Sequence, residues 1–356
     1  MTTFSTPLLW LLFAAGTAAT WIAGIYLSRT TDVLEERWKL GEAFGGMILL
    51  AISGTLPEIA ITLSAVLGGR PDIAAGNLLG GIAVQTGVLI ICDYFVIEKK
   101  PLSYLVGSLI PVLEASLVVA VTALAMLGAL LPQSVAVYGV SPASIAIVVV
   151  WLFGLFVIKR VRDAPKWALD MKGSQPGRPH RRVPHPTVVH PYHATRTWKI
   201  VSLFLTGSVV TLGAGVALTV SGTLLADRYG IGGVIFGATV LAVASALPEI
   251  STGITAARLG DNQLVMGDIF GGNAFQLTLF LVADLMAGKA VLASAGNQNS
   301  WLAALGILVT MVYAASIIIR PEKNYFRIGM DSIIVFALLV IGTIGLAGIP
   351  APPPLP

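Results

Sequence analysis

The chain has 356 residues, of which 56% are hydrophobic and only 11% are charged, and its formal net charge is +4. Soluble domains carry about 25% charged residues, so this chain has too few charges to cover a surface that faces water. Together with the mean hydropathy of +0.85, this composition excludes a soluble domain and predicts an all-α polytopic membrane protein. The single cysteine, Cys92, excludes an intrachain disulfide.

Long apolar runs follow one another along the whole chain. A helix needs about 20 apolar residues to cross a bilayer, and the sequence predicts ten such helices. They cover roughly residues 7–27, 40–67, 73–97, 102–127, 136–158, 200–224, 232–257, 264–287, 300–319 and 329–349. No Lys or Arg precedes the first run, which is longer than the core of a signal peptide, so we expect a retained helix. Residues 351–356 form a short tail.

The segment 159–199 separates the fifth and sixth predicted helices. It holds ten of the 22 basic residues, two acids and all four histidines, His180, His185, His190 and His193. One interpretation is a metal-binding histidine tract, and the other is a flexible basic linker that faces anionic lipid. Because the histidines alternate with prolines and match no compact metal site, the linker is favoured. No nucleic-acid partner is expected.

Basic residues gather in alternate loops. The loops after the first, third, fifth and ninth predicted helices each hold two or more Lys or Arg residues, and the loop after the seventh holds Arg258. The intervening loops hold at most one each. Because cytoplasmic loops carry such an excess, the basic linker is expected in the cytoplasm. Both termini are then expected on the other side of the cell (inner) membrane.

A stretch of about forty residues occurs twice. Residues 45–87 recur as residues 236–278 when the sequence is shifted by 191 positions, and 14 of the 40 residues at 46–85 are identical in the second copy. Five predicted helices separate the copies, so the halves 1–158 and 200–350 enter the membrane from opposite sides. The sequence thus predicts ten helices as two inverted five-helix repeats, a layout that many secondary transporters share.

Each copy contains a Leu-Pro-Glu motif in the middle of a predicted helix. Proline has no N–H, and its ring clashes with the carbonyl four residues earlier, so each motif interrupts its helix. Pro57 frees the carbonyl of Ser53, and Pro248 frees that of Ala244. A carboxylate at membrane depth costs several kcal/mol and indicates a functional site. The two carboxylates are those of Glu58 and Glu249.

The next helix of each copy carries a stripe of residues spaced four apart, which places them on one face. The two stripes are Asn77, Gly81 and Gln85, and Asp268, Gly272 and Gln276. Glu58, Glu249, Gln85 and Gln276 are expected to converge near the midplane. They would form an all-oxygen site for a hard cation, since calcium takes six to eight oxygen ligands and no Cys or His is near. The alternative is a kinked packing motif, but its repetition favours the ion site.

Other polar residues have two interpretations each. Asp268 is either a third carboxylate of the ion pathway or an N-terminal helix cap, and the cap is favoured because Asn77 takes the matching place. Glu42 either helps cations reach the site or begins a solvated helix. Glu114 either packs with an internal hydrogen bond or belongs to a proton route. The shift of 191 also relates two aspartates near helix ends, which are expected at the membrane interface: Asp93 and Asp284.

At these motifs the chain resembles the cation/calcium exchanger superfamily. The resemblance rests on Gly54-Thr55-Leu56-Pro57-Glu58, Gly76-Asn77, Gly80-Gly81, Ser245-Ala246-Leu247-Pro248-Glu249, Gly267-Asp268 and Gly271-Gly272-Asn273. It implies ten spans in two inverted halves, and antiport of calcium or a similar cation against sodium or protons by alternating access. Such a transporter is not an enzyme and uses no cofactor besides the cation that it carries.

The chain departs from the sodium-coupled members of this superfamily. Those members have paired Thr and Ser hydroxyls before each Pro-Glu, serine in place of the second glycine, and Asn or Asp in place of the glutamine. Half of the hydroxyls are missing here. The residues concerned are Gly54, Thr55, Ser245 and Ala246, with Gly81, Gly272, Gln85 and Gln276. The resemblance therefore implies the calcium/proton branch. Sodium-coupled calcium exchange and sodium/proton-type exchange are the alternatives, and a cation channel is a remote one.

Overall fold

The computed structural model describes residues 4–38, 51–163, 195–294 and 296–350. Within these residues, eight helical segments are long and apolar enough to cross a membrane. They are α1 (Thr6–Arg37), α4 (Pro71–Phe95), α6 (Ile110–Ala129), α7 (Pro142–Asp163), α8 (Thr197–Tyr229), α12 (Asn262–Gln276) followed by α13 (Leu279–Ala287), α14 (Gly296–Ile319) and α15 (Met330–Ala347). The prediction of a mostly helical membrane protein is confirmed.

A further segment is long and apolar enough to cross a membrane only when a bent pair of helices is counted together. Its first part comprises the short helix α9 (Gly233–Phe236), the π-helical turn η3 (Gly237–Leu241) and α10 (Ala242–Ser245). Its second part is α11 (Leu247–Leu259), which is inclined by 45° to the first. Of the predicted helix at 40–67, residues 51–67 are described and contain α3 (Leu56–Leu67). The count of ten spans therefore stays a prediction.

Two predicted helices begin later than their hydropathy suggests. In place of a helix over 102–127, α5 (Leu102–Leu105) is followed by a turn at Gly107, whose φ is 63°, and α6 begins at residue 110. In place of a helix from 136, residues 133–141 form η2 (Gln133–Val135) and a bridge between Val137 and Val140. Apolar residues recur through both stretches, so their presence does not reveal these backbone turns.

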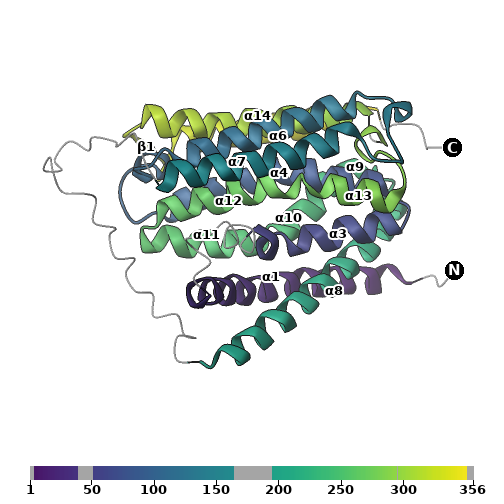
Figure 1. Ribbon diagram of the computed structural model, residues 1–356, viewed down its shortest axis with the longest axis horizontal. Coiled ribbons are helices and arrows are strands. Elements are labelled where there is room, and N and C mark those ends of the chain that lie inside the picture. The colour runs from purple at the N-terminus through teal and green to yellow at the C-terminus, as the bar shows by residue number, and fades with distance from the viewer. Residues whose placement is uncertain (1–3, 39–50, 164–194, 295, 351–356) are drawn as a thin grey trace, which may run out of the picture.

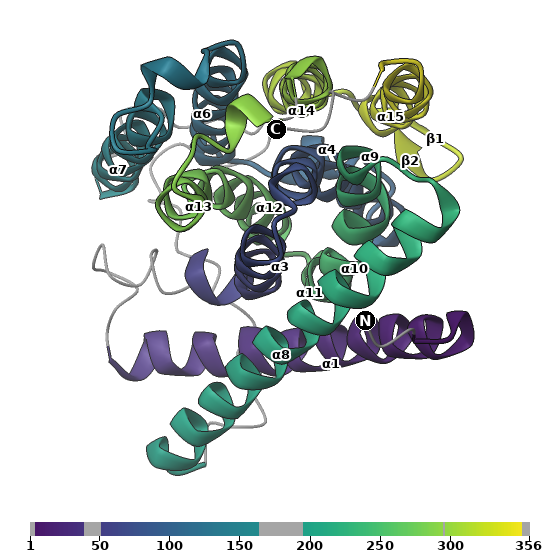
Figure 2. The same ribbon diagram turned by 90° about the vertical axis from the view of Figure 1, so that its right-hand side faces the viewer.

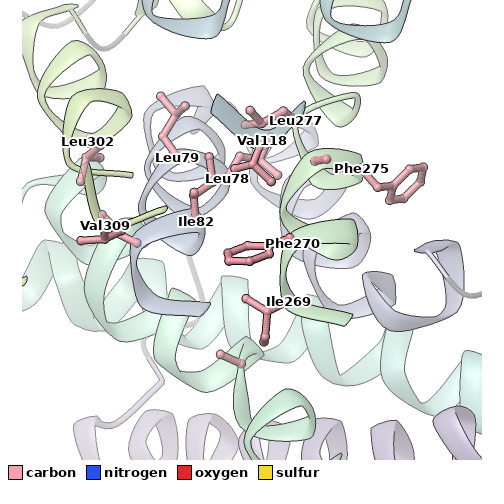
Figure 3. Packing of buried hydrophobic residues seen from close by; sticks show 14 of the residues in the cluster. Leu78, Leu79, Ile82, Val118, Ile269, Phe270, Phe275, Leu277, Leu302 and Val309 are labelled. Carbon is pink, nitrogen blue, oxygen red and sulfur yellow. The ribbon is translucent and has the colours of Figure 1, made fainter. Parts of the chain in front are cut away.

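The helices form a bundle whose centre is α4 and α12 (Figures 1 and 2). In their most apolar windows, 67% of the residues in α4 and in α12–α13 are buried, against 28% in α1 and α8. Figure 3 shows apolar side chains of α4, including Leu78 and Ile82, near Phe270 of α12 and Val309 of α14. The structure is completed by η4 (Leu292–Ser294) and by a hairpin of β1 (Asn324–Tyr325) and β2 (Ile328–Gly329).

Helices α1 and α8 cross each other on one side of this centre (Figure 2). The internal repeat extends into them, although sequence reasoning did not follow it that far. The residues of α1 that recur in α8 at the shift of 191 include Gly16, Thr20, Ala23, Gly24 and Leu27, matched by Gly207, Thr211, Ala214, Gly215 and Leu218. A Cβ on Gly16 would lie 3.2 Å from Leu218 Cγ, and one on Gly207 would lie 3.2 Å from Leu27 Cγ. The crossing of α1 and α8 therefore has approximate two-fold symmetry.

Each of these helices also packs against the motif helix of the opposite half. A Cβ on Gly24 of α1 would lie 2.5 Å from Cγ of Pro248, and one on Gly215 of α8 would lie 2.4 Å from Cβ of Ala60 in α3. Such separations are shorter than a van der Waals contact. The two glycines are thus the points at which α1 and α8 reach the broken helices.

Gly215→Ala is expected to destabilise the protein by about 1–3 kcal/mol, because the added methyl group overpacks the contact with Ala60. The matched control is Gly213→Ala on the same helix, because Gly213 is exposed and no described atom lies within 4 Å of its Cβ position. Thermal unfolding in detergent measures both variants. Equal stability of the two variants would contradict the packing argument.

Asp93 lies at the end of α4 and accepts hydrogen bonds from residues at the start of α15. Its Oδ2 accepts hydrogen bonds from the Gly329 N–H at 2.6 Å and from the Ser332 hydroxyl at 2.7 Å, and its Oδ1 accepts one from the Leu102 N–H at 2.7 Å. The side chain is 2% exposed. This carboxylate is buried within the protein because three donors satisfy it, and its predicted position at the membrane interface stays a prediction.

Asp284 does the same at the start of α7. Its Oδ2 accepts hydrogen bonds from the Ser141 N–H at 2.9 Å and from the Ser144 hydroxyl at 2.7 Å, and its Oδ1 accepts one from the Val291 N–H at 2.7 Å. It is fully buried within the protein, and its predicted position at the membrane interface also stays a prediction. Each carboxylate accepts one hydrogen bond from a backbone N–H and another from the hydroxyl of a serine that lies three residues after that N–H in the sequence. Each joins a helix end of one half to a helix start of the other half.

Candidate functional site

The first Leu-Pro-Glu motif interrupts its helix as predicted. Residues 51–54 are helical, Thr55 forms a turn, and α3 begins at Leu56. The Thr55 N–H donates to the Ala51 carbonyl at 3.2 Å, and the chain resumes with the Ile59 N–H donating to the Thr55 carbonyl at 3.0 Å. Proline therefore stands in the first turn of α3, where its missing N–H costs least.

The second motif repeats this geometry. Ala246 lies between α10 and α11, and its N–H donates to the Ala242 carbonyl at 3.1 Å. The Ile250 N–H then donates to the Ala246 carbonyl at 3.1 Å. Pro248 has no N–H with which to reach the carbonyl of Ala244. Each half of the protein thus has a helix break directly before its glutamate.

Glu58 is buried at the centre of the bundle, with 1% of its surface exposed. Its Oε1 accepts a hydrogen bond from Gln85 Nε2 at 2.9 Å, so the predicted Glu–Gln pair of the first half forms. Its Oε2 has no hydrogen-bond partner among the described residues. The side chain of Ser245, from the other half, lies near this carboxylate.

Glu249 is 9% exposed and lies on the wall of a cleft that Ser53, Gly54 and Pro57 also line. Within the described part of the chain, its Oε2 has no hydrogen-bond partner. Its carboxylate interacts electrostatically with those of Glu58 and Asp268. The cleft thus joins Pro57, next to Glu58, with Glu249, although the two motifs are 191 residues apart in sequence.

The two glutamines are not used in the same way. Gln276 Nε2 donates to the Leu78 carbonyl of α4 at 2.8 Å instead of to Glu249, and its buried Oε1 has no partner among the residues described. A Cβ on Gly81 would lie 3.0 Å from Gln276 Nε2. Glycine at position 81 therefore leaves the room in which the glutamine of the other half lies.

The hydroxyls before the motifs bond to their own helices. Thr55 Oγ1 donates to the Ala51 carbonyl at 2.8 Å, and Ser245 Oγ contacts the Ala242 carbonyl at 3.2 Å. A Cβ on Gly272 would lie 4.0 Å from the Thr55 methyl group, so Gly272 faces the opposite break without contacting it closely. Of the predicted supporting residues, Ser53, Gly54, Pro57 and Pro248 line the cleft of Glu249, and the roles of the whole set stay predictions.

Asp268 and Asn77 are not helix caps, contrary to the prediction. Asp261 caps α12 by accepting a hydrogen bond from the Leu264 N–H at 3.1 Å, and α4 begins at Pro71. Asp268 lies in the middle of α12 and lines the same cleft as Glu249. Asn77 is fully buried in α4, and neither atom of its amide has a partner among the described residues.

Glu114 lies on α6, outside the cleft that Glu249 lines. Its Oε1 is 3.5 Å from an Nη atom of Arg162, at the end of α7. A Cβ on Gly267 of α12 would lie 3.2 Å from Glu114 Oε2. Glu114 therefore lies between three helices, its Oε2 has no hydrogen-bond partner among the described residues, and its two interpretations stay predictions. Glu42 and the four histidines lie outside the described residues.

The site can hold a hard cation with oxygen atoms only. It offers two carboxylates, the amide oxygen of Gln276 and backbone carbonyls at the breaks. Among the described residues, no group of three His, Cys, Asp and Glu side chains forms a metal cluster. A buried two-carboxylate site at two repeated helix breaks is typical of secondary cation transporters, which bind their substrate between repeats near the midplane.

Comparison with known proteins gives the family. The family model described as sodium/calcium exchanger protein matches residues 8–161 and 199–348. The chain belongs to this family of secondary cation antiporters, which are not enzymes.

Two relatives have similar sequences. The protein named "Putative antiporter CaxA" of Alkalimonas amylolytica is 25% identical over 263 residues, which cover 72% of this chain and 74% of that protein. Inner membrane protein YrbG of Escherichia coli (strain K12) is 26% identical over 239 residues, which cover 66% of each.

Solved structures show the same fold. The H⁺/Ca²⁺ exchanger CAX matches with a TM-score of 0.68 and 15% identity, over 96% of this chain and 85% of that one. Native YfkE matches with a TM-score of 0.61 and 14% identity, over 95% and 92%. The sodium-calcium exchanger NCX_Mj matches with a TM-score of 0.56 and 15% identity, over 97% and 100%.

Proposed function

We propose that this antiporter exchanges calcium, or a similar divalent cation, for protons, and that Glu58 and Glu249 bind both in turn. The observation that carries the proposal is the pair of buried glutamates, each with an Oε2 that no described residue satisfies. Two ionised carboxylates in such surroundings repel each other and lose the solvation of water. A divalent cation or protons would neutralise them, so binding of one displaces the other.

Gln85 and Gln276 would hold the geometry of the site in both states. Gln85 cannot titrate, and its amide already donates to Glu58 at 2.9 Å. The Oε1 of Gln276 is an acceptor that a bound cation could use. The two breaks would supply further carbonyl oxygens, which helps to reach the six to eight ligands that calcium takes.

Protons are favoured over sodium as the counter-ion because few hydroxyls face the centre. Sites for several sodium ions need several oxygen ligands each. Here the Thr55 hydroxyl donates to its own helix, and Gly81 and Gly272 contribute no side chain. The relatedness in fold to an H⁺/Ca²⁺ exchanger agrees with this choice, whereas the fold of the sodium-calcium exchanger keeps sodium as the alternative.

The inverted repeat of the two halves supports transport by alternating access.

The end of α7 and the start of α8 lie at the same end of the bundle as the β1–β2 hairpin, toward the left of Figure 1. This placement suits a basic linker and a basic hairpin on one face, which we propose to be the cytoplasmic face. Both termini would then lie on the opposite face of a cell (inner) membrane.

Calcium uptake into proteoliposomes under imposed gradients tests the proposal. An outwardly directed proton gradient is expected to drive uptake without sodium, and an ionophore that collapses the pH gradient is expected to abolish it. Liposomes without protein provide the background. Uptake that is driven by a sodium gradient alone would overturn the choice of protons.

A further inference from the structure

The two halves of the site differ one helical turn away from the glutamates. In the second half, Thr252 follows Glu249 on α11, and Asp268 stands opposite it on α12. In the first half, the shift of 191 places Ile61 and Asn77 at these positions. Ile61 and Asn77 are fully buried, whereas Thr252 and Asp268 are only half-buried. Polar and partly exposed side chains therefore continue outward from the glutamates in the second half alone.

Thr252 and Asp268 face each other across this path. Thr252 Oγ1 lies 3.5 Å from Asp268 Oδ2, and it also contacts the backbone carbonyls of Pro248 at 3.2 Å and Glu249 at 3.3 Å. A carboxylate, a hydroxyl and two carbonyls thus lie within one turn of each other. Oxygen ligands of this kind suit a hard, partly hydrated cation.

The same cleft contains an independent sign of a ligand. Glu249 is 9% exposed, lines the cleft with Thr252 and Asp268, and its Oε2 has no hydrogen-bond partner among the described residues. The opposite wall is α1, with Leu27 and Ser28. A cation bound in this cleft would therefore meet the buried, unsatisfied Oε2 of Glu249 at the inner end of the cleft.

The order of these groups follows from the helix directions. Thr252 lies three residues, or about 4.5 Å, beyond Glu249 toward the loop that joins α11 to α12. Asp268 lies eight residues, or about 12 Å, before Gln276 on the same side. An ion that approaches from the α11–α12 loop would meet Asp268 before it reached the glutamates.

We infer that Asp268 and Thr252 form an outer binding station for the divalent cation on one face of the transporter. The inference rests on the proposed function and adds an asymmetry to it. From the α11–α12 face, a cation binds first at Asp268 and then moves inward to Glu249. From the other face it reaches the glutamates without such a station, because Ile61 and Asn77 stand there.

The test replaces each residue so that little shape changes. Asp268→Asn installs the residue type of the sister repeat, and Thr252→Val removes the hydroxyl while keeping the branched shape. Asp261→Asn, at the cap of the same helix, is the matched control. The concentration of calcium that half-saturates exchange is measured separately from each face, in vesicles of right-side-out and inside-out orientation.

Asp268→Asn is expected to raise this concentration about tenfold on the α11–α12 face and less than about twofold on the other. Thr252→Val is expected to act on the same face more weakly, and Asp261→Asn to leave both faces unchanged. Equal changes on both faces, or no change on either, would overturn the outer station while leaving the proposed exchange intact. A wild-type protein without calcium exchange would overturn both.

Discussion

Glu58→Gln and Glu249→Gln are each expected to lower calcium exchange by at least about 100-fold. Glutamine keeps the shape of glutamate but removes its charge, and a loss of about 3 kcal/mol of cation binding corresponds to about 100-fold. The fold should survive, because removing a buried charge without a cation is often neutral or stabilising. Radioactive calcium uptake measures exchange, and thermal unfolding in detergent measures the fold.

Glu322→Gln is the matched control for this substitution. Glu322 has a side chain that is 69% exposed and lies 3.8 Å from Lys100 at the surface, so exchange should be unchanged. The two site variants need not be equal, because Gln85 donates to Glu58 whereas Gln276 donates to the backbone of α4. Exchange that persists in both site variants would contradict the assignment of Glu58 and Glu249 as the cation-binding residues.

Asp93→Asn and Asp284→Asn are each expected to destabilise the protein by about 2–4 kcal/mol. In both clusters one carboxylate oxygen accepts two hydrogen bonds and the other accepts one. An Asn amide replaces one of these acceptors by a donor in either orientation. At least one buried donor then faces another donor without a partner.

Thermal unfolding compares these variants with Asp227→Asn. The Asp227 side chain is 56% exposed and pairs with Arg70 at 2.8 Å, so its loss should cost less than about 1 kcal/mol. Hydrogen exchange should also locate the damage, with faster amide exchange in the first turn of α15 for Asp93→Asn and of α7 for Asp284→Asn. A loss of stability no larger than in the control would refute the role of these carboxylates.

The helix breaks and the paired glutamates could be predicted because the cause is local. Pro57 and Pro248 lack an N–H wherever they stand, and this chemistry interrupts a helix without help from distant residues. The shift of 191 then related the two motifs, and the inverted arrangement followed from the helices between them. Ser245 of the second half lies near Glu58 of the first half, which agrees with this arrangement.

The predictions that failed depend on where helices begin and on contacts distant in sequence. Asp268 and Asn77 were expected to be caps, but a spacing of four residues identifies a helix face and not its first residue. The burial of Asp93 could not be predicted from its place near a helix end. Its partners Gly329 and Ser332 are 236 and 239 residues away, so hydropathy near Asp93 carries no sign of them.

The role of glycine was only partly visible in the sequence. The sequence places Gly81 on the helix stripe that leads to Gln85, and the structure identifies its close neighbour as Gln276 of the other half. Gly24 and Gly215 were overlooked, although they match at the same shift. Extending the search for the repeat beyond residues 45–87 would have found them.

Proton release on calcium binding tests the central claim most directly. Calcium is added to the purified protein in weakly buffered detergent solution at a series of pH values, and the protons released are counted against the calcium bound. The account predicts that calcium binding releases protons from the wild type, and that Glu58→Gln and Glu249→Gln lose both the binding and the release. Calcium binding that releases no protons at any pH, or that is unchanged in both variants, would contradict it.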